Sequence, residues 1–270
     1  MLRARIIPCL LVHDKGLVKT VAFASPKYVG DPLNAVRIFN EKEVDELVVL
    51  DIDATARGVE PDYVMIRQLA AECRMPLCYG GGVRTVEQAQ RILQLGVEKV
   101  ALSQSLHEDP TLVTRMAASI GGQSVVAVLD VRKHSKSGMY ECFTVNGTKP
   151  TGRDPVIFAA ELERLGVGEI LLNHIDRDGQ MKGYDLELVE RVRAATTVPL
   201  SVLGGAGTLK DLEGLVERHR IIGACAGSLF VFKGIYRAVL INYPNREQKA
   251  ALCATGAKRL ATPHGNDSST

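Results

Sequence analysis

Two glycine-rich segments recur in this chain at a fixed distance, and they constrain its fold more than any other feature. Gly-Gly-Gly at residues 80–82 and Gly-Gly-Ala-Gly at residues 204–207 each follow a short apolar run, 204 − 80 = 124 positions apart. Ser-Gln-Ser at residues 103–105 and Gly-Ser-Leu at residues 227–229 share that offset. A chain of 270 residues that repeats its strand-end residues once is predicted to have two similar halves.

Eight apolar runs alternate with eight amphipathic segments along the chain. The runs are rich in Val, Ile and Leu without strict alternation, which is typical of strands covered on both faces. We expect strands at residues 5–12, 46–53, 76–80, 99–103, 124–131, 169–176, 200–204 and 221–226. We expect helices at residues 31–44, 62–74, 86–95, 110–120, 155–165, 186–195, 209–218 and 233–242.

Eight βα units in about 245 residues predict an α/β protein, a single (β/α)8 TIM barrel with a two-fold half-barrel repeat. The alternative is an open doubly wound sheet. We place the barrel at residues 1–244 and expect a poorly ordered tail at 245–270, which ends in small polar residues.

Composition excludes several classes of function. A net charge of +2 gives no global attraction to nucleic acid or to a membrane. No apolar run reaches the roughly 18 residues of a spanning helix, and no secretory signal opens the chain. The six cysteines are dispersed without a CxxC spacing, which favours reduced thiols in a cytoplasmic protein. His13, His134 and His174 lack metal-ligand spacing, so we expect neither metal nor cofactor.

Function in such a barrel lies where strands lead into the following loops. Glycines at these ends let backbone amides approach a phosphate, and serine hydroxyls add donors. Tight turns alone are the alternative, but two sites at matched offsets favour a phosphorylated small-molecule substrate. The expected phosphate-binding residues are Gly82, Ser103, Gln104, Asp178, Gly179, Gly205, Gly227 and Ser228.

Asp130 follows an apolar run at the end of the fifth expected strand. A carboxylate among apolar residues has a raised pKa suited to general acid–base catalysis, with a structural ion pair as the alternative. Lys19, Asp51, Asp176 and Asp178 are expected at the same mouth, each with a structural role as the alternative, and we take Asp130 and Lys19 as the catalytic candidates.

A different pattern marks the strand starts. Arg5, Glu46, Lys99 and Glu169 begin the first, second, fourth and sixth expected strands. If they point inward, two cations and two carboxylates meet at the closed bottom of the barrel. On the residues alone we interpret them as a stabilising layer of salt bridges, since this face usually serves stability.

Motifs spread over most strands resemble the HisF family, the cyclase subunit of imidazole glycerol phosphate synthase, from about residue 1 to residue 243. They include Arg-Ile-Ile-Pro-Cys-Leu at 5–10, Gly-Gly-Gly-Val at 80–83, Ile-Asp-Arg-Asp-Gly at 175–179 and Gly-Gly-Ala-Gly at 204–207. The resemblance implies two phosphate sites and a HisH-like glutaminase partner at the N-terminal face, which sends ammonia through the barrel. It also matches Arg5, Glu46, Lys99 and Glu169 to a charged ring that gates the ammonia passage, which replaces the stabilising interpretation.

One departure from the family pattern bears on catalysis. The pattern has catalytic aspartates at the ends of the first and fifth strands; the fifth matches Asp130, but the first is Leu11. General acid–base assistance contributes roughly 10²–10⁴-fold in rate, so ordinary cyclisation is expected to be badly impaired. Ser103 and Gln104 replace the usual Asn-Thr, Asn173 and His174 replace Thr-Ser, and Asp53 stands where Thr is usual.

Segments 16–20, 26–31 and 37–44 resemble barrel paralogues that accompany a sugar amidotransferase in surface-polysaccharide gene clusters. That resemblance implies ammonia delivery for converting an acetamido sugar into an acetamidino sugar. Three functions stay open: such an ammonia-handling subunit, a true cyclase of histidine biosynthesis that forms imidazole glycerol phosphate and AICAR, and a non-catalytic ammonia conduit. Leu11 argues against the cyclase and leaves the other two functions open.

Overall fold

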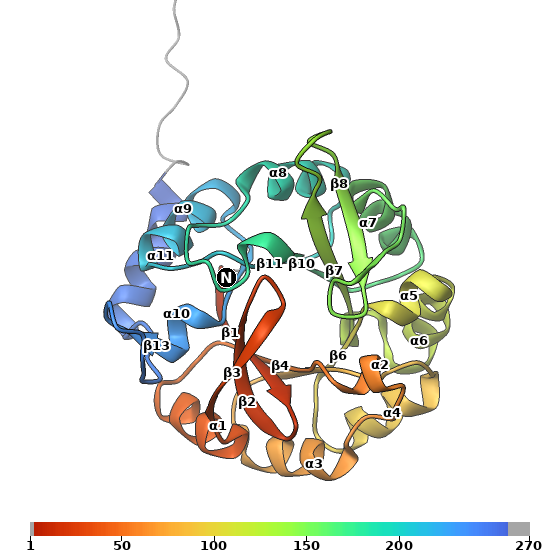
Figure 1. The fold of residues 1–270 in the computed structure, drawn as a ribbon, viewed down its shortest axis with the longest axis horizontal. Coiled ribbons are helices and arrows are strands. Elements are labelled where there is room, and N and C mark those ends of the chain that lie inside the picture. The colour runs from red at the N-terminus through yellow and green to blue at the C-terminus, as the bar shows by residue number, and fades with distance from the viewer. Residues whose placement is uncertain (1–2, 259–270) are drawn as a thin grey trace, which may run out of the picture.

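A closed ring of eight parallel strands forms the centre of the molecule (Figure 1). The computed structural model describes residues 3–258. Around the ring the strands are β1 (Arg5–His13), β4 (Leu47–Asp51), β5 (Leu77–Gly80), β6 (Lys99–Leu102), β7 (Val125–Lys133), β10 (Glu169–His174), β11 (Leu200–Leu203) and β12 (Gly223–Ala226). Pairing of β12 with β1 closes the ring, which confirms the predicted barrel and rules out the open sheet.

The main helices surround the strands as an outer layer (Figure 1). They are α1 (Pro32–Glu41), α3 (Tyr63–Glu72), α4 (Val86–Gln94), α6 (Leu112–Ile120), α7 (Pro155–Arg164), α8 (Leu186–Ala195), α9 (Leu209–His219) and α11 (Arg246–Lys258). Side chains that accept backbone N–H groups fix several helix starts, as the sequence predicts. Asp31 and Asp154 cap α1 and α7, and Thr85 forms a capping box with Gln88 at α4.

Two separate cores explain why the strands are apolar on both faces. The larger core fills the space between strands and helices. The smaller core lies inside the barrel and contains Ile7, Cys9, Val48, Cys78, Ala101, Val126, Val128, Leu171, Leu203 and Cys225. Successive residues of a strand point to opposite faces, so each barrel strand contributes to both cores in turn.

Further elements follow the carboxyl ends of the strands and surround the mouth of the barrel (Figure 1). Two are hairpins that the sequence did not predict. In the first, β2 (Gly16–Val21) pairs with β3 (Ala24–Gly30). In the second, β7 continues beyond the barrel and pairs with β8 (Tyr140–Thr144), which pairs with β9 (Lys149–Pro150). Short helices α2 (Ala54–Arg57), α5 (Gln104–Glu108) and α10 (Ser228–Val231), together with a 3-10 turn at Ile175–Arg177, complete this layer. A second 3-10 turn, Gly122–Ser124, precedes β7.

The position predicted for the last helix is wrong. Residues 233–242 do not form a helix; they lie in and after a small hairpin of β13 (Phe232–Lys233) and β14 (Ala238–Val239). Gly234 adopts φ +73° in its turn, and Ile235 and Tyr236 project into solvent, so this segment has no buried apolar face. The helix that completes the outer layer is α11, which packs against α9.

The structure differs from the expectation of a poorly ordered tail at residues 245–270, because residues Arg246–Lys258 form α11. Arg246 pairs with Glu43 at 3.0 Å, Lys249 pairs with Asp45 at 3.0 Å, and Leu252 is buried. Residues 259–270 of that tail lie outside the described residues. No helix in residues 3–258 is both long and apolar enough to cross a membrane.

Candidate functional site

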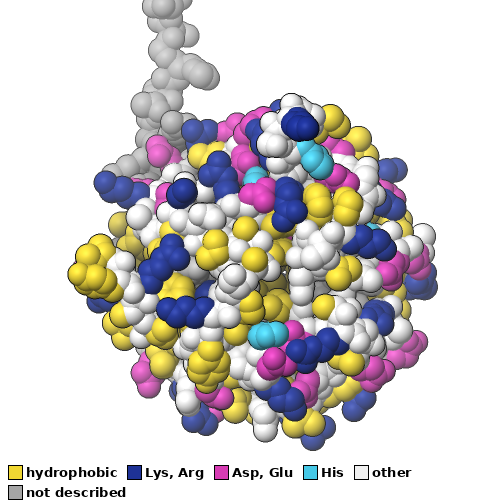
Figure 2. All heavy atoms as spheres, in the orientation of Figure 1, with side chains coloured by type: hydrophobic (Ala, Val, Ile, Leu, Met, Phe, Trp, Pro, Cys, Tyr) yellow, Lys and Arg dark blue, Asp and Glu magenta, His cyan; other side chains and the backbone are white. Residues whose placement is uncertain are grey.

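The strand ends enclose a cavity at the mouth of the barrel. Figure 2 shows this face hollowed at its centre, with hydrophobic side chains in the recess. The structure brings seven of the predicted site residues to the cavity wall: Lys19, Gly82, Ser103, Gln104, Asp130, Asp178 and Gly227. Asp51 lines it too, whereas Asp176, Gly179, Gly205 and Ser228 do not.

Asp130 is the mouth carboxylate with the most strongly raised pKa. Burial raises its pKa to about 6, and the nearby charge of Asp178 adds to the shift, while hydrogen bonds from Asn173 and Ser103 oppose it. The Asn173 amide donates to Oδ1 of Asp130 at 2.9 Å. A carboxyl group that titrates near pH 6 exchanges protons readily at neutral pH.

Lys19 reaches the mouth from β2 and is buried. Its Nζ donates to the Cys9 carbonyl at 2.6 Å, and burial lowers its pKa. A Cβ at residue 227 would lie 2.6 Å from this Nζ, so Gly227 leaves the space that the ammonium group occupies. Asp178 beside it accepts a hydrogen bond from Thr20 at 2.6 Å.

Leu11 lines the cavity where the family pattern has its first aspartate. It pairs with Val18 and Leu50 on the neighbouring strands and packs against the inner core. β1 and β7 are opposite one another in the eight-membered ring, so Leu11 and Asp130 belong to opposing walls. The mouth therefore has a titratable group on the β7 wall and an inert one at the matching place on the β1 wall.

The strand-end glycine of the first half, Gly82, lies in a turn that requires glycine. Gly82 adopts φ +72°, its amide donates to Oγ1 of Thr55 at 3.2 Å, and a Cβ there would lie 2.9 Å from the Val59 carbonyl. Beside it, the Gln104 amide donates to Glu108 at 2.6 Å, and Glu108 also lines the cavity. A carboxylate at this wall opposes the approach of a phosphate.

The corresponding glycines of the second half are covered by a loop. A Cβ at Gly205 would lie 2.1 Å from the Gly183 carbonyl, and one at Gly207 would lie 2.4 Å from the Met181 carbonyl. The amide of Gly183 donates to the Gly205 carbonyl at 2.8 Å, which holds the loop in place. Glycine is needed at both positions for this backbone contact, and the two halves of the mouth are not equivalent.

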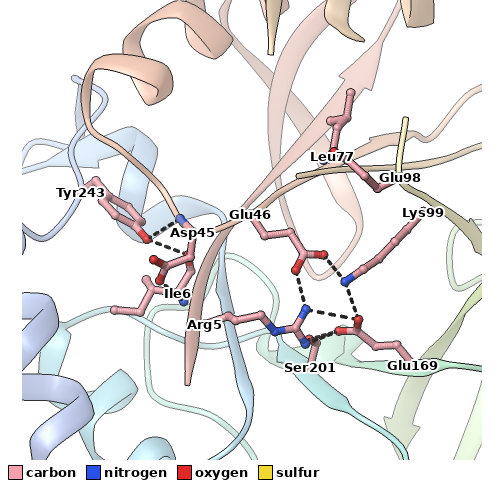
Figure 3. Close-up of polar contacts among 10 residues, drawn as sticks. All are labelled: Arg5, Ile6, Asp45, Glu46, Leu77, Glu98, Lys99, Glu169, Ser201 and Tyr243. Carbon is pink, nitrogen blue, oxygen red and sulfur yellow. Dashed lines mark hydrogen bonds and ion pairs between the residues drawn. The ribbon is translucent and has the colours of Figure 1, made fainter. Parts of the chain in front are cut away.

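A closed ring of four charges lies at the opposite end of the barrel (Figure 3). Lys99 Nζ is 2.8 Å from both Glu46 and Glu169. Arg5 completes the ring through Nη2, 2.7 Å from Glu169 Oε1, and through an ion pair with Glu46. Burial alone would raise the pKa of Glu169, but the hydrogen bonds and charges of Arg5 and Lys99 lower it to about 2.

Between this ring and the mouth, the interior of the barrel is apolar apart from three thiols. Cys9, Cys78 and Cys225 are buried there among aliphatic side chains. Burial raises the pKa of Cys9 to about 12 and that of the other two well above the usual range. The thiols therefore stay neutral, and the interior carries no charge from these residues at physiological pH.

Comparison with known proteins places this barrel among its relatives. The family model described as histidine biosynthesis protein matches residues 5–236, which is most of the chain. The chain belongs to the histidine biosynthesis protein family.

Individual relatives agree with this placement. The chain is 58% identical over 249 residues to a Vibrio vulnificus protein named "Putative imidazole glycerol phosphate synthase subunit hisF3", covering 92% of this chain and 96% of the relative. It is 57% identical to a similarly named Leptospira interrogans protein, covering 93% and 99% of the two chains. It is 39% identical to the "Imidazole glycerol phosphate synthase subunit HisF" of Streptococcus sanguinis, covering 85% and 91%. The resemblance to HisF is thereby confirmed.

One cluster of side chains in this barrel has the composition of a metal site. Within residues 3–258, only His13, Asp14 and Asp53 bring three such ligand atoms together. Arg57 already lies 2.6 Å from Asp14 and 3.3 Å from Asp53. A guanidinium group that neutralises both carboxylates leaves this cluster better explained as an ion-pair network than as a cation site.

Two side chains of the candidate site were not among the predicted site residues. Asn173 holds the Asp130 carboxyl group, and Thr20 holds Asp178. In the sequence Asn173 stands out only as a departure from the family pattern, although its place at a strand end is a signal that would identify it. Thr20 lies in a hairpin that the sequence did not predict, so no signal marked it.

Proposed function

We propose that this barrel receives ammonia through its base from a HisH-like glutaminase and releases it at the mouth for the formation of an acetamidino sugar. A sugar amidotransferase would use this ammonia to replace the amide oxygen of an acetamido group with nitrogen, and the oxygen would leave as water. In this proposal the ring of Arg5, Glu46, Lys99 and Glu169 is the gate, and the apolar interior is the passage.

The observation that carries the proposal is the contrast between the two ends of the barrel. The base keeps four mutually paired charges around the barrel axis. The mouth has Leu11 where cyclisation would require a second proton-transfer group. In this proposal an ammonia passage needs the charged ring at the base, whereas only a cyclase needs the second proton-transfer group that Leu11 replaces.

The second candidate is the cyclase reaction of imidazole glycerol phosphate synthase, which forms imidazole glycerol phosphate and AICAR. Asp130 favours it, because a carboxyl group with a pKa of about 6 is suited to general acid–base catalysis. Lys19 would then be the second titratable group at the mouth. The names of the relatives are consistent with this candidate. A third candidate is a conduit without chemistry of its own.

Isotope retention tests the ammonia passage directly. Glutaminase, barrel and sugar amidotransferase are combined with the acetamido sugar, glutamine labelled with nitrogen-15 in its amide, and excess unlabelled ammonium. Channelled nitrogen keeps its label in the acetamidino product, which is followed by mass spectrometry. Equal product and equal label with and without the barrel would remove the channelling role.

A matched pair of variants locates the passage. Lys99→Ala opens the ring and should lower label retention more than it lowers product formed from added ammonium salt. Arg218→Ala removes an exposed ion pair with Glu190 on the outer helices and should change neither. Loss of ammonium-driven product in Lys99→Ala to the same extent would indicate a folding defect in place of a gate.

A further inference from the structure

An exposed apolar tip stands at the edge of the face that carries the mouth of the barrel. Ile235 and Tyr236, at the turn between β13 and β14, are 89% and 90% exposed, more than any other large hydrophobic side chain in residues 3–258. Tyr28 on β3 is 66% exposed. Figure 2 shows hydrophobic side chains gathered at the edge of this face, over β13. Exposure of this kind marks interaction sites in soluble proteins.

Cations surround this tip without acidic partners. Lys233 and Arg237 flank Ile235 and Tyr236 in the chain, and Lys27 lies 5.7 Å above the Phe232 ring. None of the three cations forms an ion pair with a described residue, so their charges are available to a partner. An apolar tip with unpaired cations is complementary to an apolar pocket with a rim of carboxylates.

The tip is connected to the mouth through two contacts. Arg237 donates to the Gly179 carbonyl at 3.4 Å, and Gly179 follows the cavity residue Asp178. On β3, Lys27 pairs in register with the cavity residue Lys19 on β2. A protein seated on this tip would therefore be held next to the opening of the barrel.

We propose that Ile235, Tyr236 and the cations Lys27, Lys233 and Arg237 form the docking surface for the enzyme that accepts the ammonia. This inference rests on the proposed function. Its occupant is an acid-rimmed protein whose active site caps the mouth, because ammonia released into water is protonated and loses its nucleophilicity. Tyrosine and arginine are the residue types that most often carry the binding energy of such an interface.

Calorimetric titration of the full-length barrel with the purified sugar amidotransferase tests the surface. The double variant Ile235→Ser, Tyr236→Ser should bind at least tenfold more weakly than wild type. Ile157→Ser is the matched control, since Ile157 is 71% exposed on α7 and lies outside the proposed surface. Tyr236→Phe should retain binding, and the affinity of the wild type should fall as salt rises.

The outcomes separate this inference from the function on which it rests. If wild type fails to bind the amidotransferase, the sugar-directed function and the surface are both overturned. Equal binding by wild type and the double variant overturns the surface alone. Vesicles of anionic phospholipid are the second probe; binding to them that the double variant loses, without any such effect on the enzyme, would make the tip a membrane contact and overturn the proposal.

Discussion

At the scale of single residues, the mouth combines a carboxyl group whose pKa is raised by burial with a side chain that cannot transfer protons. Asp130 is held by Asn173 and titrates near pH 6. Leu11 packs against Leu50 and contributes only apolar surface. We therefore predict an effect on catalysis for a substitution of Leu11 and an effect on stability for a substitution of Asp130.

Wild-type barrel should show weak or no cyclase activity with ammonium salt, and Leu11→Asp should raise it. The added carboxylate supplies a second acid–base group, whose effect is on the order of 10²–10⁴-fold where the rest of the site is competent. Product formation from the phosphoribulosyl-formimino carboxamide nucleotide measures the rate. Leu50→Asp places a carboxylate on the neighbouring strand as the control and should not help. Wild-type turnover of roughly 1 s⁻¹ or more would contradict this prediction.

Asp130→Asn should stabilise the fold at pH 7.5 and leave it nearly unchanged at pH 4. The raised pKa means that the folded state disfavours the ionised carboxylate. The free-energy cost of ionising Asp130 in the folded state therefore grows as pH rises from about 4 toward 6 and is constant above that, at about 3 kcal/mol. Asparagine keeps an acceptor for Asn173 without the charge. Urea unfolding at both pH values measures the difference, and an equal effect at both would show that ionisation is not its cause.

At the scale of elements, the barrel strands and the capped helices could be predicted from sequence, whereas the hairpins around the mouth could not. The strands are long apolar runs, and helices such as α1 and α7 begin at an Asp-Pro pair. The β2–β3 hairpin contains no Asn-Gly or Asp-Gly turn, and its turn residues Ala22 and Phe23 adopt positive φ through tertiary contacts.

The same limit applies to the candidate site. Residues directly at strand ends, such as Asp130 and Ser103, were predicted and do line the cavity. The covering of Gly205 by the Gly183 loop was not predicted, because it depends on a contact between segments that follow different strands. The last helix was misplaced because α11 is anchored mainly by tertiary ion pairs and by Leu252, not by a strong amphipathic pattern.

That dependence makes α11 testable. Leu252→Ala removes a buried side chain from the interface of α11 with the barrel and should lower the free energy of unfolding by about 2 kcal/mol. Glu247→Ala, on the exposed surface of the same helix, should change it by less than about 0.5 kcal/mol. Thermal and urea unfolding measure both variants. Equal stability of the two would mean that α11 contributes nothing to the fold.

At the scale of the whole molecule, the two halves share a repeat in sequence but differ at their ends. Inorganic phosphate should bind more weakly beside Gly82 and Ser103 than beside Gly227 and Ser228, because Glu108 lines the first site. Glu108→Gln should strengthen binding at the first site by about 2- to 5-fold, which is the usual size of an exposed charge effect. Phosphate soaks and titration locate and measure the sites, with Glu190→Gln as control. Two glycine loops left empty at saturating phosphate would refute the sites altogether.

The alternating order of charges at the base has a consequence for which form of nitrogen the barrel would admit under the proposed function. Positive and negative groups that alternate around a ring form a quadrupole, and their potentials largely cancel on the central axis. An ammonium ion on that axis is attracted and repelled almost equally, yet it still loses its hydration shell. Neutral ammonia loses only a few hydrogen bonds there. The base of this barrel would therefore act as a filter for protonation state, and the flux through it would follow the unprotonated fraction.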